Sequence, residues 1–205
     1  MAKLKAPLFS LGATQQLGKA LVFFNWKGLN VVREYVIPSN PKTDPQKEQR
    51  GFLKLAVAGI HNAEVDPGKP FVAADATAYA LLGSLQPTPR TWFNEICRQW
   101  LNQLRAGDDA IVWSGGLVTP GSELLTVNLG GHAPTGDPVT NGKLYYGTSK
   151  THMLDSIDAT PAELDPGKDI PSLSPGVKYF LQYRPTEPAD YVGANSGIYY
   201  GVPLV

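Results

Sequence analysis

The sequence has a single cysteine, Cys97, and only three histidines. One cysteine cannot close an intramolecular disulfide, and it cannot build a cysteine-based metal site within one chain. Cys97 falls in an apolar helical stripe, where we expect a buried structural thiol rather than a nucleophile. His61, His132 and His152 lack the short spacing that a zinc site requires. The sequence therefore predicts no metal and no cofactor.

Net charge and long apolar runs are also missing. The chain balances 18 basic against 18 acidic residues, so it generates little long-range field to attract nucleic acid or anionic lipid. No apolar run is long enough to cross a membrane, and the first residues lack the apolar stretch of a secretion signal. We expect a chain made in the cytoplasm, with neither nucleic acid nor a membrane as its partner.

Catalytic motifs are equally scarce. The glycine pairs at 115–116 and 130–131 lack the strand and helix context of a phosphate-binding loop, and they are predicted to be turns. No serine stands in a nucleophile elbow, and the paired carboxylates lie in segments rich in turn residues. We expect a protein that is not an enzyme, although an unrecognised pocket with converging ionisable groups would reopen that alternative.

Glycine and proline are abundant instead, at 21 and 18 residues, which favours many turns over a helical bundle. Residues 1–19 have neither helical nor alternating periodicity, and we expect an extended arm that is ordered by a partner. Two β-rich runs, 21–26 and 29–37, flank Lys27-Gly28 and predict a β-hairpin.

Three helices should follow the hairpin. The first begins near Thr43 and carries apolar residues at helical spacing up to about Ala63, the second covers 73–85, and Thr91 caps a third that ends near Gly107. Beyond this point short strands separated by turn residues replace the helical period, so we expect an assembly domain over 1–107 and a β-domain over 108–205. The predicted strands are 110–113, 123–129, 143–148, 153–157, 177–184 and 197–202.

The sharpest local motif runs from Leu173 to Arg184. A leucine and a proline precede Tyr179 by six and four residues, so its ring can close a corner and its hydroxyl can bond to backbone upstream. This tyrosine corner of Leu173, Pro175 and Tyr179 resembles the entry to strand F of fibronectin type III domains, and 144–149 and 196–201 resemble their strands C and G. The chain departs from that family at 123–129, which lacks the core tryptophan usual in strand B. The resemblance implies an antiparallel fibronectin type III or Ig-like β-sandwich, so the expected class is α+β.

The N-terminal part carries a second resemblance. Trp26-Lys27-Gly28, Val32-Arg33-Glu34-Tyr35-Val36, an Asn-Pro bend at 40–41 and a Gln/Arg-bearing helix start occur in that order. This order resembles an uncharacterised family encoded by phages and prophages, which implies a virion setting. Phe24, Trp26, Arg33 and Tyr35 are the candidate assembly residues, whereas a plain structural role, with the aromatic rings in a core and Arg33 solvated, is the alternative for each.

These observations predict a phage virion structural protein, as a capsid decoration, a head–tail joint or a tail component. Its N-terminal part would assemble with other copies and other virion proteins, because ordering an apolar-poor arm costs about 1–2 kcal/mol per residue that only external contacts can offset. The alternative is a host-surface module that binds carbohydrate or protein through loops and tyrosines of the sandwich.

Overall fold

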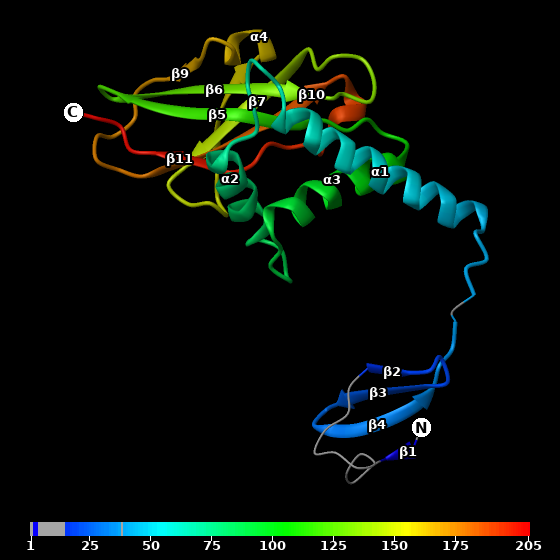
Figure 1. Ribbon diagram of the computed structural model, residues 1–205. Helices are drawn as coiled ribbons and strands as arrows, with labels where there is room; N and C mark the ends of the chain where they lie inside the picture. The colour runs from blue at the N-terminus through cyan, green and yellow to red at the C-terminus, as the bar shows by residue number, and fades with distance from the viewer. Residues whose placement is uncertain (1, 4–14, 38) are drawn as a thin grey trace. The chain divides into compact units, whose positions relative to one another are not determined.

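The computed structural model describes residues 2–3, 15–37 and 39–205 (Figure 1). Its contacts divide the chain into two compact units, Met1–Thr43 and Asp44–Val205. Helices and antiparallel sheets are both present, which confirms the mixed α+β class. Within the described residues, no helix has the length and apolar character needed to cross a membrane.

The first unit is a sheet with the strand order β1-β4-β3-β2. Its centre is the predicted hairpin, which turns at Lys27 and Gly28 with φ values of 50° and 77°. The expectation that a partner orders the arm is wrong for its described segments, because residues 2–3 and 15–17 pair with the hairpin of the same chain as edge strands; residues 1 and 4–14 of the arm lie outside the described residues. The strands are β1 (Ala2–Lys3), β2 (Gln15–Leu17), β3 (Leu21–Trp26) and β4 (Leu29–Glu34).

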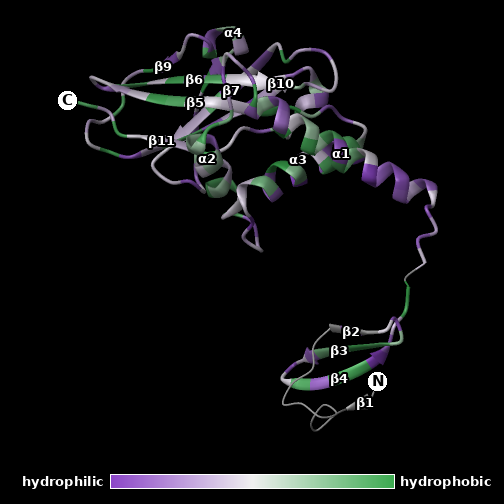
Figure 2. Cartoon of the chain, viewed as in Figure 1, coloured by the Kyte–Doolittle hydropathy of each residue, from purple (hydrophilic) through white to green (hydrophobic). Residues whose placement is uncertain are grey.

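The three predicted helices are confirmed as α1 (Asp44–Glu64), α2 (Ala73–Gly83) and α3 (Trp92–Ala106). Local chemistry sets the ends of α3: the Thr91 side chain accepts a hydrogen bond from the backbone N–H of Asn94, and Gly107 ends the helix at φ 86°. In α1 the first turns are hydrophilic and the apolar residues lie further along, where the helix packs (Figure 2).

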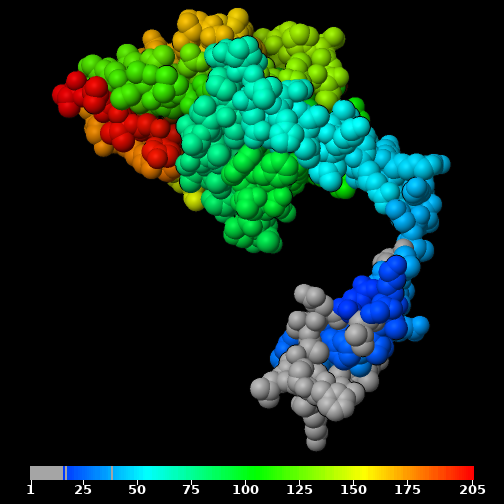
Figure 3. Space-filling view, in the orientation of Figure 1, coloured from blue at the N-terminus to red at the C-terminus, as the bar shows by residue number. Residues whose placement is uncertain are grey.

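The helices form a small core with the start of the following strand. Gly59 of α1 lets α3 approach, because a β-carbon there would come within 2.7 Å of the Trp100 ring. Figure 3 shows the helical residues, cyan to green, continuous with the strand residues on the face of this unit that it displays. The buried members of the core are Ala56, Ile60, Ala63, Tyr79, Ile96, Cys97, Trp100, Ala110 and Val112.

The rest of the second unit is two antiparallel sheets, with strand orders β5-β6-β9 and β11-β10-β7-β8. Each strand pair is antiparallel, and a register shift in β5 between Ser114 and Leu117 bends that strand. The strands are β5 (Val112–Gly121), β6 (Leu124–His132), β7 (Asn141–Gly147), β8 (Asp155–Ala159), β9 (Lys168–Ile170), β10 (Tyr179–Glu187) and β11 (Tyr199–Gly201), with the short helices α4 (Pro161–Leu164) and η1 (Ala189–Tyr191) between them.

Both sheets contribute to one hydrophobic core. Its largest side chain is Trp113 of β5, which is fully buried and meets the Tyr183 ring edge-on at 4.7 Å between centroids. The indole N–H donates to the Ala194 carbonyl at 2.9 Å, and the Tyr183 hydroxyl donates to the Ala159 carbonyl at 3.1 Å. The core therefore has a tryptophan, on β5 rather than on the following strand.

The two glycine pairs are not turns, so that prediction is wrong. They lie in the paired strands β5 and β6, where Ser114 faces Gly130. Their missing side chains make room for Lys69 from the loop between α1 and α2: a β-carbon on Gly115 or Gly130 would meet the Lys69 side chain at 2.7 or 2.6 Å. The Lys69 ammonium continues to Asn128 Oδ1 at 2.5 Å and to Asp165 Oδ1 at 2.9 Å.

The boundary expected between residues 107 and 108 does not coincide with the division of the contacts. Hydrogen bonds tie the helices to the rest of the unit: the Tyr79 hydroxyl accepts from the buried Trp113 N–H of β5, and the partly buried Gln103 amide donates to the carbonyls of Asp109, Asp190 and Val192. The change from helical to alternating periodicity marks a change of secondary structure within one unit, Asp44–Val205.

Candidate functional site

The four candidate assembly residues lie on one face of the N-terminal sheet. The register pairs Phe24 with Val31 and Val22 with Arg33, and side chains on one strand alternate between faces. Phe24, Trp26 and Arg33 therefore share a face, and Tyr35 continues the alternation two residues beyond Arg33. The Arg33 guanidinium lies 5.4 Å from the centroid of the Phe24 ring. The structure brings these residues together as one aromatic and cationic surface.

The described residues of this sheet form very little core. Among the described residues of the unit whose burial is defined, Val31 is the only one in the buried class. Trp26 is 52% exposed and Leu29, its cross-strand neighbour, is 46% exposed. A sheet is stabilised by burying one face against another layer. Val31 lies on the same face as Trp26 and Leu29, so the exposed apolar surface on that face is at the hairpin end, at Trp26 and Leu29, and that end is open to a partner.

The histidines are dispersed. His61 Nδ1 lies 2.8 Å from Glu64 Oε2 on α1, His132 Nδ1 lies 3.2 Å from Asp66 Oδ2, and His152 is exposed. The backbone N–H groups of Lys69 and Gly68 lower the pKa of Asp66 below its usual range, and His132 lowers it further. Over the described ranges, no three His, Cys, Asp or Glu side chains gather as metal ligands would.

Cys97 is buried in α3, and burial raises the pKa of its thiol. A protonated thiol is a poor nucleophile and a poor metal ligand. This environment fits the structural role that the sequence indicates.

The most connected polar group is Asp75, a fully buried carboxylate in the first turn of α2. Oδ2 accepts from the Val72 N–H at 2.9 Å and from the Gly115 N–H at 3.1 Å. Oδ1 accepts from the Gly116 N–H at 2.9 Å and from the Tyr199 hydroxyl at 2.7 Å. Asp75 therefore joins its own helix, β5 and β11 through four hydrogen bonds.

The tyrosines around Asp75 stay protonated. Burial, followed by the charge of Asp75, raises the pKa of Tyr199 well above its usual value, and burial also raises that of Tyr79. Each Asp75 oxygen already accepts two hydrogen bonds, so it has little capacity left for a substrate proton. The arrangement is suited to holding the helix on the sheets rather than to moving protons.

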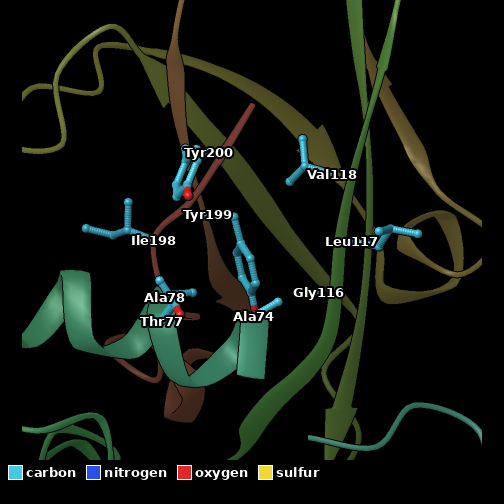
Figure 4. Close-up of a pocket in the computed structure, with 9 residues that line it drawn as sticks. All are labelled: Ala74, Thr77, Ala78, Gly116, Leu117, Val118, Ile198, Tyr199 and Tyr200. Atoms are coloured by element: carbon cyan, nitrogen blue, oxygen red, sulfur yellow. The ribbon is translucent and has the colours of Figure 1, made fainter. Parts of the chain in front are cut away.

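A cavity of about 310 Å³ adjoins this group, between α2, β5 and β11. Figure 4 shows Val118 directed from β5 toward the hollow, with the Tyr199 ring standing beside Gly116 and Ala74 of α2. Its lining is mainly apolar, and it has no free acid or base. Sequence reasoning missed this centre, because Asp75 lies in an alanine-rich helix and only its place in the first turn marks it as a cap.

The predicted tyrosine corner has the expected hydrogen bond. The Tyr179 hydroxyl accepts from the Ser174 N–H at 3.2 Å, five residues upstream. Leu173 is 4% exposed and joins the core of the sheets, while Pro175 is exposed. This motif shapes the entry to β10 and carries no reactive group.

No family model and no curated protein sequence matches this chain.

Proposed function

We propose that this chain is a structural protein of a phage virion, which assembles through its N-terminal part and displays its C-terminal part. The observation that carries the proposal is the exposure of Trp26, at 52%, in an N-terminal sheet where Val31 is the only buried residue among those whose burial is described. A small sheet with so little buried surface gains stability when a second layer covers it. Other copies of the same chain can supply that layer in a symmetric oligomer. The virion setting itself rests on the resemblance of this segment to phage-encoded proteins.

For the displayed part we propose a fibronectin type III or Ig-like sandwich. The segments that resemble strands C, F and G are β7, β10 and β11, and they are neighbours in the order β11-β10-β7. Strands C, F and G also share a sheet in Ig-like domains, which supports this assignment. The hydrogen bond from Ser174 to Tyr179 at the entry to β10 supports it independently.

Light scattering on the full chain tests the assembly. We expect a defined oligomer for the wild type and monomers for the double variant Trp26→Ser, Tyr35→Ser, which removes two rings from the aromatic face. The matched control is Leu154→Ser, since Leu154 is 78% exposed but lies in the other unit. A monomeric wild type, or an oligomer that survives the double variant, would refute assembly through this face. Mass spectrometry of purified phage particles tests the virion setting: the chain should be found in the particle.

The alternative is a host-surface binding module. It is favoured by an exposed cluster on the sheet β11-β10-β7-β8. Tyr200 is 49% exposed, its ring lies 6.4 Å from that of Phe180, and the Lys178 ammonium is 3.8 Å from its centroid. Exposed aromatic rings stack on sugars and anchor protein contacts. If Tyr200→Ser abolishes attachment of the protein to host cells while its mass stays unchanged, the binding function is the better account.

A further inference from the structure

A second cleft, of about 350 Å³, lies inside the unit Asp44–Val205 and shares one lining residue, Ile198, with the cavity beside Asp75. It is formed by the end of α2, by α3, by the loop after β7, and by β10 with the segment that follows it. Its lining contains Arg98, Lys150 and Arg184 but no aspartate and no glutamate. The cleft therefore combines three cations with no carboxylate on its own walls.

Arg184 and Lys150 contact neutral side chains, which orient the two cations without neutralising their charge. Arg184 Nε donates to Gln182 Oε1 at 2.9 Å, and its guanidinium lies 4.3 Å from the centroid of the Tyr145 ring. Lys150 Nζ donates to Ser84 Oγ at 3.0 Å. Within the described part of the chain neither Lys150 nor Arg184 pairs with a carboxylate, whereas Arg98 pairs with the buried Glu95. Two of the three positive charges are thus free to meet an anion.

The amide of Gln99 opens into the cleft. Gln99 is only 7% exposed and lines the cleft, and its side chain makes no hydrogen bond to any described residue. Among the described residues, the buried side-chain nitrogen and oxygen atoms without a partner are Trp100 Nε1 and His132 Nε2, so the Gln99 amide is not sealed from solvent, and water or a ligand in the cleft can bond to it. Gln86 and Asn195, also on the cleft wall, have no side-chain hydrogen bond within the described chain either. Three amides on the cleft wall therefore make no side-chain hydrogen bond within the described chain and are open to water or a ligand.

We propose that this cleft binds a small anionic ligand rich in hydroxyl groups, of the class of a carboxylate-bearing monosaccharide. Arginine and lysine meet the carboxylate with charge-assisted hydrogen bonds, and amides are suited to hydroxyl groups because they both donate and accept. Leu82, Met153 and Ile198 give the cleft apolar wall for the C–H face of a sugar ring. The volume lies within the range of small-molecule sites, roughly 300–1,000 Å³.

This inference goes beyond the assembly role. The cleft belongs wholly to the second unit and includes none of the candidate assembly residues. A chain that proves monomeric would keep it, and an oligomer without ligand affinity would leave the assembly proposal intact.

The test is saturation-transfer NMR and calorimetry on the full chain, with glucuronate, galacturonate and N-acetylneuraminate as anionic probes and glucose and inorganic phosphate as references. We expect at least one acidic sugar to bind about tenfold more tightly than glucose or phosphate. If none of the three binds, the proposal is overturned. If phosphate binds as tightly as the best sugar, the cleft is a simple anion site and the sugar assignment is wrong.

Variants locate the binding. Arg184→Gln and Gln99→Leu should each weaken binding of the acidic sugar about tenfold or more, while Arg105→Gln, on α3 like Gln99 but outside the cleft lining, should leave it unchanged. The melting temperature of ligand-free Gln99→Leu separates binding from structure, because the Gln99 amide makes no hydrogen bond within the described chain and contributes little to the fold. We expect it to stay level or rise; a marked fall, or binding unaffected by both cleft variants, would contradict the assignment.

Discussion

The ring of Tyr199 lies so close to the backbone of Gly116 that a β-carbon at position 116 would come within 2.0 Å of the ring atom Cε1. The same ring directs its hydroxyl to Asp75 Oδ1 at 2.7 Å. The glycine is therefore needed for the approach that lets β11 reach the carboxylate of α2.

Gly116→Ala should be destabilising, since the buried ring and its hydrogen bond leave no direction in which to relax. We expect a loss of about 1–3 kcal/mol in the free energy of unfolding, the usual range for overpacking. Chemical denaturation measures it. Gly51→Ala is the matched control, because Gly51 lies within α1 with nothing within 4 Å of an added β-carbon. That change should stabilise by up to about 1 kcal/mol, and equal effects of the two substitutions would contradict the packing argument.

Asp75→Ala should cost more than any single donor of its network. It leaves the N–H groups of Gly115 and Gly116 buried without their acceptor, at about 1–3 kcal/mol for each such group. We therefore expect a loss of about 3 kcal/mol or more in the free energy of unfolding. Tyr199→Phe is the comparison, since it removes one hydroxyl and leaves three donors to Asp75; its loss should be near 1 kcal/mol. A larger loss of unfolding free energy for Tyr199→Phe than for Asp75→Ala would contradict the central role of the Asp75 carboxylate in this network.

Tyr179→Phe tests the corner before β10. It removes the acceptor for the Ser174 N–H but keeps the ring, so we expect a loss of about 0.5–1.5 kcal/mol, the net worth of one hydrogen bond. Because Ser174 is exposed, water can partly replace the hydroxyl, which places the expected value at the lower end. Thermal and chemical denaturation should agree, and a loss above this range would mean that the hydroxyl has a second role.

Glu163 should stabilise the folded state at neutral pH through a contribution that is lost in acid. Lys168, at 2.8 Å, and the Thr160 N–H lower the pKa of its carboxyl from an ordinary 4.5 to about 2. A depressed pKa stabilises the folded state above the unfolded pKa, and this contribution disappears as pH falls from about 4.5 through about 2. In denaturation series, wild type should lose stability over that window more steeply than Glu163→Gln, with the gap between them narrowing toward low pH. Parallel curves of stability against pH for wild type and Glu163→Gln would show that the contacts of Glu163 with Lys168 and Thr160 do not stabilise the fold.

Periodic segments were the predictable part of the fold. The hairpin and three helices could be read from spacing, turn residues and caps, because these signals are local. The course of β5 through Gly115 and Gly116 could not, since glycine pairs usually mark turns and these two glycines make room for distant side chains, Lys69 at Gly115 and Tyr199 at Gly116. Strand β9 and helix α4 were missed because both are very short, three and four residues.

The candidate sites divide in the same way. The shared face of Phe24, Trp26 and Arg33 follows from strand alternation, so the sequence was enough to select them as a group. Asp75 and the amide of Gln99 acquire their meaning only from groups far along the chain: Asp75 accepts from a tyrosine 124 positions away. No local sequence pattern indicates such a distant pairing. The assignment of a fibronectin type III or Ig-like sandwich stays a prediction that rests on the strand order β11-β10-β7 and on the tyrosine corner at Tyr179.

The backbone N–H groups of Gly115 and Gly116 donate to Asp75 on α2 and not to a neighbouring strand. Their amide protons therefore report on separation of α2 from β5, which the hydrogen bonds between strands do not report. They can exchange with deuterated water only when α2 lifts from the strands or the whole unit opens. Their exchange rates, compared with those of the ladder amides in β6 and β10, would therefore time the detachment of the helix separately from global unfolding.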